Sequence, residues 1–457
     1  MSTLQRTLLI AMLIAILAPA GQARAAQFTE TETAPFGVFN GTEYVQYKGR
    51  FQGSTELGEF DVPFEFVAPA DPAAGNGTVL VEPSHFSLRT GVRDLILTPR
   101  FLFNRGFGYA TLGFGANGLN VLDPEAAPIV VAGDPVEEPG EVDQSAVTDR
   151  GIVVQFAEML RTSAFAEARF GPVQRIYATG LSQTAEVLEG ILLGPDAQGL
   201  FDQYQLVVSL WEPIFAGEEI GAPSLFPNTR GTFEQPEGVG KIVWTLTEGD
   251  LLISNAEQFF NSVGEPDSRV YVVAGGAHQP LTGALGIRDQ LAFRANGLDW
   301  TPVARAAFVA GDRWVRRGVE PPPDRLLETT GEIDPIYETV TGIARDENLN
   351  ARGGVRLPKV EAGRLQYIAS ELEFEVPGLT GLIGREIDLE CEPLPDGSER
   401  FPFPASYDWA IARQAVDLVE QGLLLKGDAI PMIFAARAAD VGRDKRCEED
   451  DSDDSGS

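Results

Sequence analysis

The sequence is poor in histidine, cysteine and lysine, and these shortages exclude several classes of function. Only two histidines and two cysteines occur among 457 residues, and they are widely separated, which argues against a transition-metal site. The 35 Lys and Arg residues stand against 67 Asp and Glu residues, so the formal net charge is −32. A nucleic-acid partner selects a basic surface, so this balance argues against one, and it disfavours anionic membranes as well.

Long apolar runs are also scarce, and the one at the N-terminus has the pattern of a secretory signal. Arg6 precedes the run LLIAMLIAILAPA, and Ala23-Arg24-Ala25 supplies small residues for cleavage after Ala25. The run is shorter than the roughly 20 residues that span a bilayer, and no later segment approaches that length. We therefore expect a signal peptide at 1–25 and an exported protein, periplasmic or extracellular, without stable membrane insertion.

The two cysteines, Cys391 and Cys447, form an even set in a chain expected to enter an oxidising compartment. This favours a disulfide, with two free thiols as the alternative. By the loop-entropy model, such a bond between residues more than 50 positions apart contributes about 4 kcal/mol to the free energy of unfolding. It would fasten the C-terminal region to the body of the protein.

Beyond residue 26 the sequence changes from a β-rich pattern to alternating strands and helices. Residues 27–68 contain two runs of alternating apolar and polar side chains, EYVQYKGRFQG and FDVPFEFVAPA, which are typical of strands. Continuous apolar runs such as GTVLVEP then alternate with segments of helical spacing, which predicts a mostly parallel sheet with helices on both faces. Strands are expected at 77–83 and 174–178, and helices at 184–193, 299–318 and 406–425. The last helix would carry on one side Trp409, Ala412, Val416, Val419 and Leu423.

Residues 26–440 are expected to form a single domain with one small insertion. Between Trp211 and Lys241 the chain is rich in Pro and Gly and has no clear period. Long irregular insertions in compact folds are usually functional, so about 212–240 is predicted to be a small cap or lid, with a plain surface loop as the alternative. The final residues, 441–457, are too acidic and too poor in apolar groups to pack, and we expect them to be disordered.

Ser182 lies between an expected strand and an expected helix, in the stretch RIYATGLSQTAEVLEGIL. A strand, a tight turn and a helix around Gly180-Leu181-Ser182 is the context in which a serine hydroxyl stands clear of a sheet as a nucleophile. Thr184 occupies the position where a second glycine is usual. The serine could instead be the N-cap of the helix, so its role depends on whether the chain supplies a base and an acid.

The presence of only two histidines makes the search for a base short. His278 follows the buried-type strand pattern RVYVVA and a pair of glycines, as expected of a histidine on a loop at a sheet edge. A nucleophile of this kind is followed along the chain first by its acid and then by its histidine, so the acid is expected between Ser182 and His278. The segment KIVWTLTEGDLL supplies two candidates, of which Asp250 is preferred and Glu248 is the second choice.

A serine nucleophile also needs backbone N–H groups that hold the negative charge developing on the reacting oxygen. One donor is expected from Gln183, the residue after the serine. The second is expected from the loop after the strand GTVLVEP, from Ser84 or His85. The His85 ring could line the pocket or make a structural hydrogen bond.

With these residues in this order, the chain resembles the α/β-hydrolase superfamily, and within it a group of exported bacterial "alpha/beta hydrolase domain" proteins. The resemblance covers most of the mature chain. It rests on the segments APADPAAGNGTVLVEP, YATGLSQTAEVL, TLTEGD, VYVVAGGAHQP, LDWTPVARAAFVAGDRWVRRGVEPPPDR and VRLPKVEA. It implies an α/β-hydrolase fold with a mostly parallel, eight-stranded sheet, and a triad of Ser182, Asp250 or Glu248, and His278.

We therefore predict an exported serine hydrolase, most simply a carboxylesterase that acts on a small-molecule ester through an acyl-enzyme. The sequence implies no metal, organic cofactor or nucleic-acid partner, and it gives no indication of an oligomeric state. Two rival functions fit the same fold. An amidase or peptidase would use the same triad, and a binding protein would keep the fold without the chemistry.

Overall fold

The computed structural model describes most of the chain between residues 25 and 441. The described residues are 25–56, 58–84, 91–114, 150–194, 197–209, 236–253, 264–279, 293–330, 342–370, 382–403, 405–439 and 441. Three predicted features lie almost entirely outside them and stay predictions. These are the signal peptide at 1–25, the cap at 212–240 and the acidic tail at 441–457.

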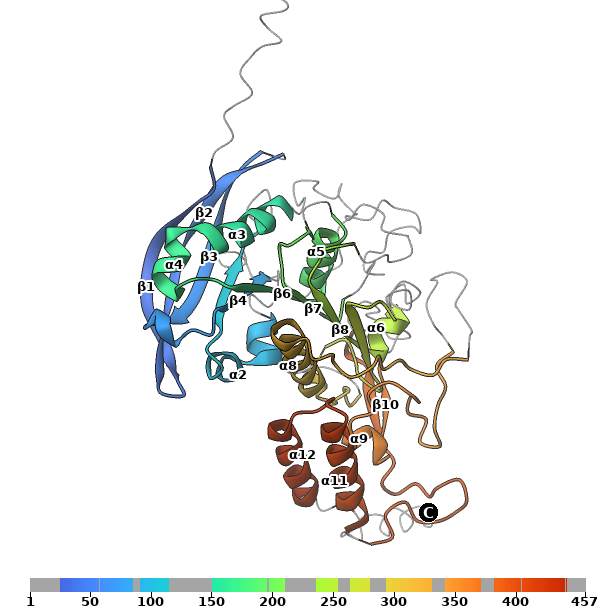
Figure 1. Ribbon diagram of the computed structural model, residues 1–457. Coiled ribbons are helices and arrows are strands. Elements are labelled where there is room, and N and C mark those ends of the chain that lie inside the picture. Colours follow the sequence, from blue (N-terminus) through green and yellow to red (C-terminus); the bar gives the residue numbers. More distant parts are fainter. Residues whose placement is uncertain are drawn as a thin grey trace, which may run out of the picture.

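A large sheet forms the centre of the described structure (Figure 1). Its strands are β1 (Gln27–Phe39), β2 (Thr42–Thr55), β3 (Gly58–Pro69), β4 (Thr78–Pro83), β5 (Gly108–Leu112), β6 (Arg175–Leu181), β7 (Gln203–Val207), β8 (Lys241–Thr247) and β9 (Ser268–Val273). Their order is β1-β2-β3-β5-β4-β6-β7-β8-β9, antiparallel from β1 to β5 and parallel from β5 to β9. The sheet has nine strands instead of the eight expected, and three of them, β1 to β3, come from the N-terminal β-rich segment.

The first three strands form a long antiparallel meander whose turn follows from the local sequence. Asn40 and Gly41 join β1 to β2, and their φ values are 49° and 82°. A tight two-residue hairpin turn requires positive φ at both positions and therefore favours Asn-Gly. Phe64 and Phe66 on β3 are buried, so the β-rich segment predicted at 27–68 is confirmed as part of the main sheet and core.

Helices cover both faces of the sheet, as the alternation of strands and helices predicts (Figure 1). One face is contacted by α3 (Arg150–Thr162), α4 (Ala164–Phe170) and α5 (Gln183–Leu192). The other is contacted by α8 (Thr301–Arg317) and by η2 (Val92–Leu97), which lies next to α2 (Pro99–Phe103). Two further short helices among the described residues are η1 (Pro72–Ala74) and α6 (Glu248–Ile253). The helices predicted at 184–193 and 299–318 are therefore confirmed as α5 and α8.

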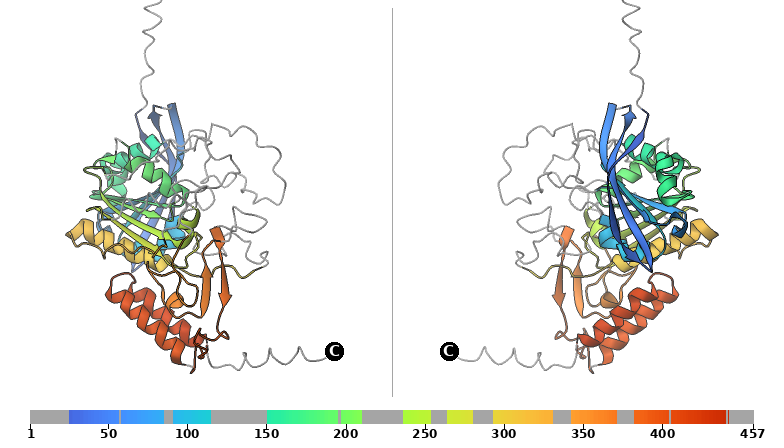
Figure 2. Two further views of the ribbon diagram at one scale, coloured as in Figure 1. Left: turned by 90° about the vertical axis from the view of Figure 1, so that its right-hand side faces the viewer. Right: turned by 90° about the vertical axis from the view of Figure 1, so that its left-hand side faces the viewer.

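The C-terminal part adds a two-stranded sheet and a helical hairpin at one end of the molecule (Figure 2). Its elements are α9 (Pro358–Glu361), β10 (Leu365–Ile368), β11 (Arg385–Asp388), α11 (Ala405–Glu420) and α12 (Lys426–Ala438). Part of the hairpin packs on the main core, through residues such as Ala415 and Leu418. The helix predicted at 406–425 is confirmed as α11, although it ends at Glu420.

The buried side of α11 is not the predicted side. Trp409 and Val416 are 72% and 49% exposed. The side chains that face inward are Tyr407, Ile411 and Leu418, which recur at the same helical period but are rotated around the axis. The prediction was wrong because α11 carries two apolar stripes, and the position of α12 and the core decides which of them is buried. The members of the predicted side that do contact the main core are Val419 and Leu423.

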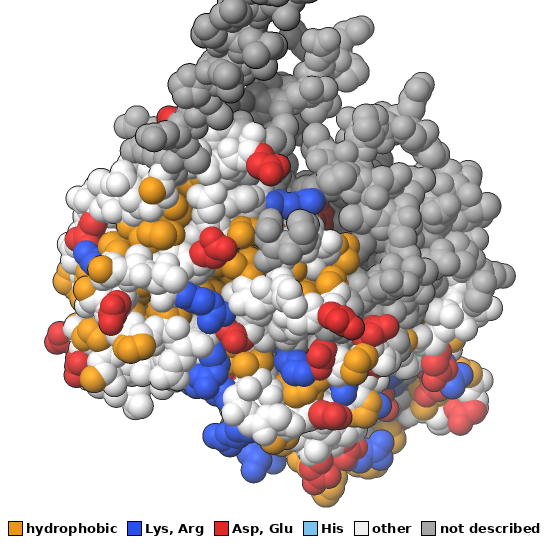
Figure 3. All heavy atoms as spheres, turned by 45° about the horizontal axis from the view of Figure 1, so that its top comes forward, with side chains coloured by type: hydrophobic (Ala, Val, Ile, Leu, Met, Phe, Trp, Pro, Cys, Tyr) orange, Lys and Arg blue, Asp and Glu red, His pale blue; other side chains and the backbone are white. Residues whose placement is uncertain are grey.

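Charged side chains of both signs are interspersed on the face of the molecule drawn in Figure 3. Ion pairs also join separate elements, such as the pair of Arg305 with Asp428 at 2.9 Å. Among the residues that the structure describes, none of the helices has both the length and the apolar character needed to cross a bilayer.

Candidate active site

Ser182 occupies a sharp turn between β6 and α5. Its φ and ψ angles are 53° and −124°, a conformation that residues other than glycine rarely adopt. A strained residue between a strand and a helix is the hallmark of a nucleophile elbow. Ser182 directly precedes α5, yet its side chain makes no capping hydrogen bond. Ser182 therefore stands at the N-cap position of α5 without capping the helix through its side chain.

The residues around Ser182 fit this turn closely. A Cβ atom on Gly180 would lie 2.6 Å from the backbone of Thr184 and Ala185, so only glycine fits there. Thr184 is buried, and its hydroxyl accepts a hydrogen bond from the Leu181 N–H at 2.8 Å and donates one to the Leu181 carbonyl at 3.0 Å. Threonine in place of the usual second glycine therefore closes the turn instead of disrupting it.

The structure brings the preferred sequence candidates together. His278 Nε2 lies 3.0 Å from Ser182 Oγ, and His278 Nδ1 lies 2.7 Å from Asp250 Oδ1. The three side chains come from the turn after β6, the start of α6 after β8, and the loop after β9. Because these parallel strands end at one edge of the sheet, residues almost 100 positions apart meet in one hydrogen-bonded row.

Asp250 is held in place from the side opposite the histidine. Its Oδ2 accepts hydrogen bonds from the Thr247 N–H at 2.6 Å and from the Thr247 hydroxyl at 2.9 Å. Asp250 is fully buried and His278 is 2% exposed, whereas Ser182 is only partly buried. The arrangement can therefore fix one imidazole tautomer, with Nδ1–H donating to Asp250 and Nε2 free to accept the serine proton.

Glu248, the second-choice acid, faces a different group. Its Oε2 accepts a hydrogen bond from the Gly275 N–H at 2.7 Å, and its Oε1 pairs with Arg345 at 2.5 Å. Burial raises the pKa of the Glu248 carboxyl, while Arg345 and the Gly275 N–H act in the opposite direction. Both oxygens are engaged away from the histidine, so the geometry favours Asp250 as its partner.

The predicted oxyanion donors differ in whether their N–H groups are available to a ligand. Gln183 is the first residue of α5, and its N–H has no acceptor within the described part of the chain. This N–H is therefore available to donate to a ligand. The Ser84 N–H donates to the Leu112 carbonyl at 2.9 Å, so Ser84 cannot supply the second donor. It is committed to the sheet because β4 pairs with β5 up to Pro83. His85 lies outside the described residues.

Several residues near the site were missed by sequence reasoning. Thr247 binds Asp250, Asn296 donates to the Gly275 carbonyl at 2.8 Å, and Trp300 donates to the Ala277 carbonyl at 2.9 Å. The sequence offers one signal for the tryptophan: it begins the segment that predicts α8, and a buried indole N–H usually has an acceptor.

Three further predictions concern residues away from Ser182. Cys391 is disulfide-bonded, and the other cysteine, Cys447, lies outside the described residues. Among the described residues, no group of three or more His, Cys, Asp or Glu side chains could hold a metal ion. Of the predicted cap, only 236–240 is described.

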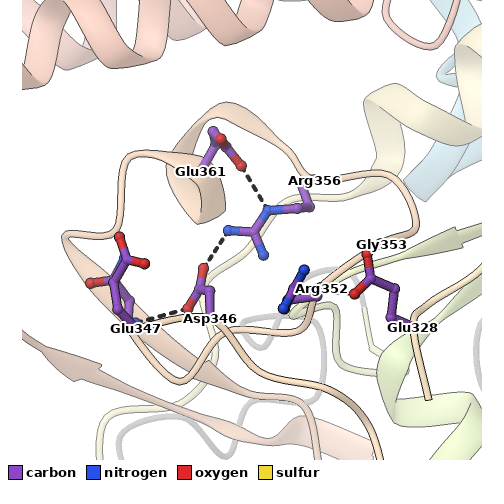
Figure 4. A pocket seen from close by; sticks show the side chains of 8 residues that line it. Glu328, Asp346, Glu347, Arg352, Gly353, Arg356 and Glu361 are labelled. Carbon is purple, nitrogen blue, oxygen red and sulfur yellow. Dashed lines mark hydrogen bonds and ion pairs between the residues drawn. The ribbon is translucent and has the colours of Figure 1, made fainter. Parts of the chain in front are cut away.

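A polar pocket is lined by none of the residues around Ser182 (Figure 4). Its lining residues are Glu328, Asp346, Glu347, Asn348, Arg352, Gly353, Arg356 and Glu361. Arg356 pairs with Asp346 at 2.5 Å and with Glu361 at 2.7 Å, and both pairs are visible in Figure 4. These pairs fix the segment that follows Arg345. Since Arg345 binds Glu248, the pocket walls help to hold Glu248 in its position next to the active site.

The sequence matches the model of the family described as "Alpha/beta hydrolase domain" over residues 54–433. The chain belongs to this family. The matched range includes Ser182, Asp250 and His278 and ends within α12. Family membership and the mostly parallel sheet flanked by helices establish the α/β-hydrolase fold. Among curated proteins, no sequence matches this one.

Several solved structures are similar to this chain at low sequence identity. A protein described as a dienelactone hydrolase from Klebsiella pneumoniae is 13% identical with a TM-score of 0.36, over 60% of this chain and 99% of that one. A cold-adapted esterase from an Arctic intertidal metagenomic library is 16% identical with a TM-score of 0.31, over 54% and 94%. Prolyl oligopeptidase B from Galerina marginata is 12% identical with a TM-score of 0.30, over 54% and 38%.

Proposed function

We propose that this α/β-hydrolase is an exported serine hydrolase that cleaves carboxylic esters of small molecules through an acyl-enzyme. The observation that carries the proposal is the row of hydrogen bonds from Ser182 through His278 to Asp250, at 3.0 and 2.7 Å. The strained turn at Ser182 adds support, because it presents the hydroxyl at the N-terminus of a helix.

In the first half-reaction Ser182 Oγ attacks the ester carbonyl carbon while His278 Nε2 takes the serine proton. Asp250 keeps the imidazole in the required tautomer and stabilises the imidazolium that forms. The negative charge moves to the carbonyl oxygen, where the Gln183 N–H is a suitable donor. His85, the remaining sequence candidate, would supply the second donor. The tetrahedral intermediate then expels the alcohol, which receives the proton from His278.

In the second half-reaction a water molecule attacks the acyl-enzyme carbonyl. His278 accepts a proton from this water and returns it to Ser182 Oγ as the carboxylic acid leaves. The atoms balance as ester plus water giving acid plus alcohol. No step in this scheme calls for a group beyond the side chains and backbone named here.

The decisive test is labelling of the purified mature protein with a fluorophosphonate, followed by mass spectrometric location of the adduct. We expect an adduct on Ser182 that is absent from Ser182→Ala. Labelling of another residue would overturn Ser182 as the nucleophile, and no labelling in folded protein would favour a binding protein that kept the fold without the chemistry. If Ser182 is labelled, turnover of matched p-nitrophenyl esters and anilides distinguishes an esterase from an amidase, and faster anilide cleavage would contradict the ester proposal.

Export is proposed from the signal pattern that ends at Ala25. The full chain expressed in a bacterium should yield mature protein that begins at Ala26 in the periplasm or the medium. N-terminal sequencing of that fraction checks the cleavage site. A protein that stays in the cytoplasm with its first 25 residues intact would contradict this part of the proposal.

A further inference from the structure

The loop that carries His278 is fixed at both of its ends. We call residues 274–279, which follow β9, the histidine loop. Its first N–H donates to the Val355 carbonyl at 3.1 Å, and its last N–H donates to the Leu382 carbonyl at 3.0 Å. These contacts join the loop to two segments far away in the sequence, so its ends cannot move independently of the body of the protein.

Three side chains from other parts of the chain bind the middle of the histidine loop. Glu248 accepts the Gly275 N–H at 2.7 Å, and Asn296 donates to the carbonyl of the same residue at 2.8 Å. Trp300 Nε1 donates to the Ala277 carbonyl at 2.9 Å. We call Glu248, Asn296 and Trp300 the loop clamp.

All members of the loop clamp are buried and have well-defined surroundings. Glu248 and Trp300 are 0% exposed and Asn296 is 3% exposed. The second oxygen of Glu248 pairs with Arg345, and Asn296 Oδ1 accepts the Leu298 N–H at 3.0 Å. Because a buried polar group that loses its partner costs free energy, each clamp residue favours one position of the loop backbone.

We propose that the loop clamp consists of positioning residues, which fix the backbone of the histidine loop and through it the His278 ring. The inference rests on the proposed serine-hydrolase function. The ring must meet an oxygen at each end, 3.0 Å from Ser182 and 2.7 Å from Asp250. A displacement of about 1 Å at such a site can lower the rate about 100-fold, so backbone placement has a large effect on catalysis.

Trp300→Phe is the sharpest test, because it removes the indole N–H and keeps an aromatic ring in the same buried site. We expect kcat on a p-nitrophenyl ester to fall about tenfold with little change in KM. The matched control is Trp314→Phe in α8, the helix that begins directly after Trp300. Trp314 is also buried, but it contacts Lys241 and Arg269 instead of the loop. Equal activity of the two variants would overturn the role of Trp300.

A second pair of variants examines Glu248. Glu248→Ala removes the acceptor for the Gly275 N–H, and we expect kcat to fall at least about tenfold. Glu248→Gln keeps one acceptor oxygen but loses the ion pair with Arg345, so it should recover most of that activity. If Glu248→Gln is instead as inactive as Asp250→Asn, the Glu248 charge acts in catalysis and the positioning role is wrong.

A background without the histidine separates positioning from general stability. In His278→Ala, adding Trp300→Phe should not lower the residual activity further, because the group that Trp300 positions is gone. The same fractional loss in both backgrounds would show a general structural role and overturn the inference. Urea unfolding of each variant identifies any that fail to fold.

Nuclear magnetic resonance of histidine rings tests the inference without turnover. The chain has only two histidines, so protein labelled with ¹⁵N-histidine gives few ring signals, and His85→Gln identifies those of His278. The His278 Nδ1 proton should exchange with water faster in Trp300→Phe than in wild type or Trp314→Phe. Unchanged exchange would contradict positioning. Failure of Ser182 labelling, by contrast, would contradict only the proposed function.

Discussion

The Thr184 hydroxyl makes two hydrogen bonds to the backbone of Leu181, one from its N–H at 2.8 Å and one to its carbonyl at 3.0 Å. These bonds span the turn that contains Ser182 and hold the end of β6 against the first turn of α5. Since Ser182 is in a strained conformation, with φ at 53°, the turn needs such a contact to persist. A small residue at this position permits the tight turn by leaving space for the backbone. Thr184 instead stabilises the same turn through its hydrogen bonds.

Thr184→Val should lower activity, because it keeps the shape of the side chain but leaves the buried Leu181 N–H without its acceptor. A buried donor without a partner costs about 1–3 kcal/mol, so we expect a clear loss of unfolding free energy and a several-fold loss of kcat. Thr184→Ser keeps the hydroxyl and is the control. Urea unfolding and ester hydrolysis measure both effects. Equal behaviour of the two variants would show that the hydroxyl is not needed.

Asp250→Asn should lose most of the activity, because an amide at this position no longer favours the imidazole tautomer that accepts the serine proton. In a serine hydrolase triad this change lowers kcat by about 10⁴-fold. The loss should far exceed that of Glu248→Gln, measured with the same ester. The reverse order of the two variants would assign the acid to Glu248.

The order of the candidate residues along the chain could be predicted, but the choice between the two acids could not. A serine after β6, an acid after β8 and a histidine after β9 are local signals, and a parallel sheet brings such strand ends together. Glu248 and Asp250 both follow β8 and are two positions apart. In a helix this spacing turns side chains about 200° from each other, so one faces Gly275 and the other His278. The direction of α6 therefore decides which of the two carboxylates faces His278.

The oxyanion prediction failed at Ser84 for a related reason. The end of β4 can be placed from its apolar run, but the register of its partner strand cannot. Because Pro83 pairs with Leu112, the next N–H is used inside the sheet. Long-range pairing of this kind leaves no mark in the local sequence.

The face of α11 yields a prediction that separates its two apolar stripes. Ile411 is 1% exposed and packs with Tyr407, Ala436 and Val441, so Ile411→Ala should lower the free energy of unfolding by about 2–4 kcal/mol. Val416 is 49% exposed, and Val416→Ala should change it by less than about 0.5 kcal/mol. Urea unfolding of both variants checks this, and a larger effect of Val416→Ala would mean that another surface covers the exposed stripe in solution.

Glu189, on the inner side of α5, should make stability depend on pH. Burial raises the pKa of its carboxyl to about 8, although Ser209 and Arg150 act in the opposite direction. A carboxyl with a raised pKa in the folded state binds more protons folded than unfolded, so its contribution to stability is complete at acidic pH and is lost as the pH rises through about 8.

Glu189→Gln carries a neutral side chain of similar size and cannot ionise, so it should escape this loss. Relative to wild type, the variant should gain on the order of 1 kcal/mol or more of unfolding free energy between pH 6 and pH 9, because each unit of pKa shift corresponds to about 1.4 kcal/mol. Urea unfolding of variant and wild type at both pH values gives the difference in their unfolding free energies. Groups that titrate equally in the two proteins cancel in this difference. The exposed Glu167→Gln, on α4, removes one carboxyl from the surface and is the control. A constant difference for Glu189→Gln would mean that the Glu189 carboxyl of the wild type is already ionised in the folded protein at pH 6, as it is in the unfolded chain.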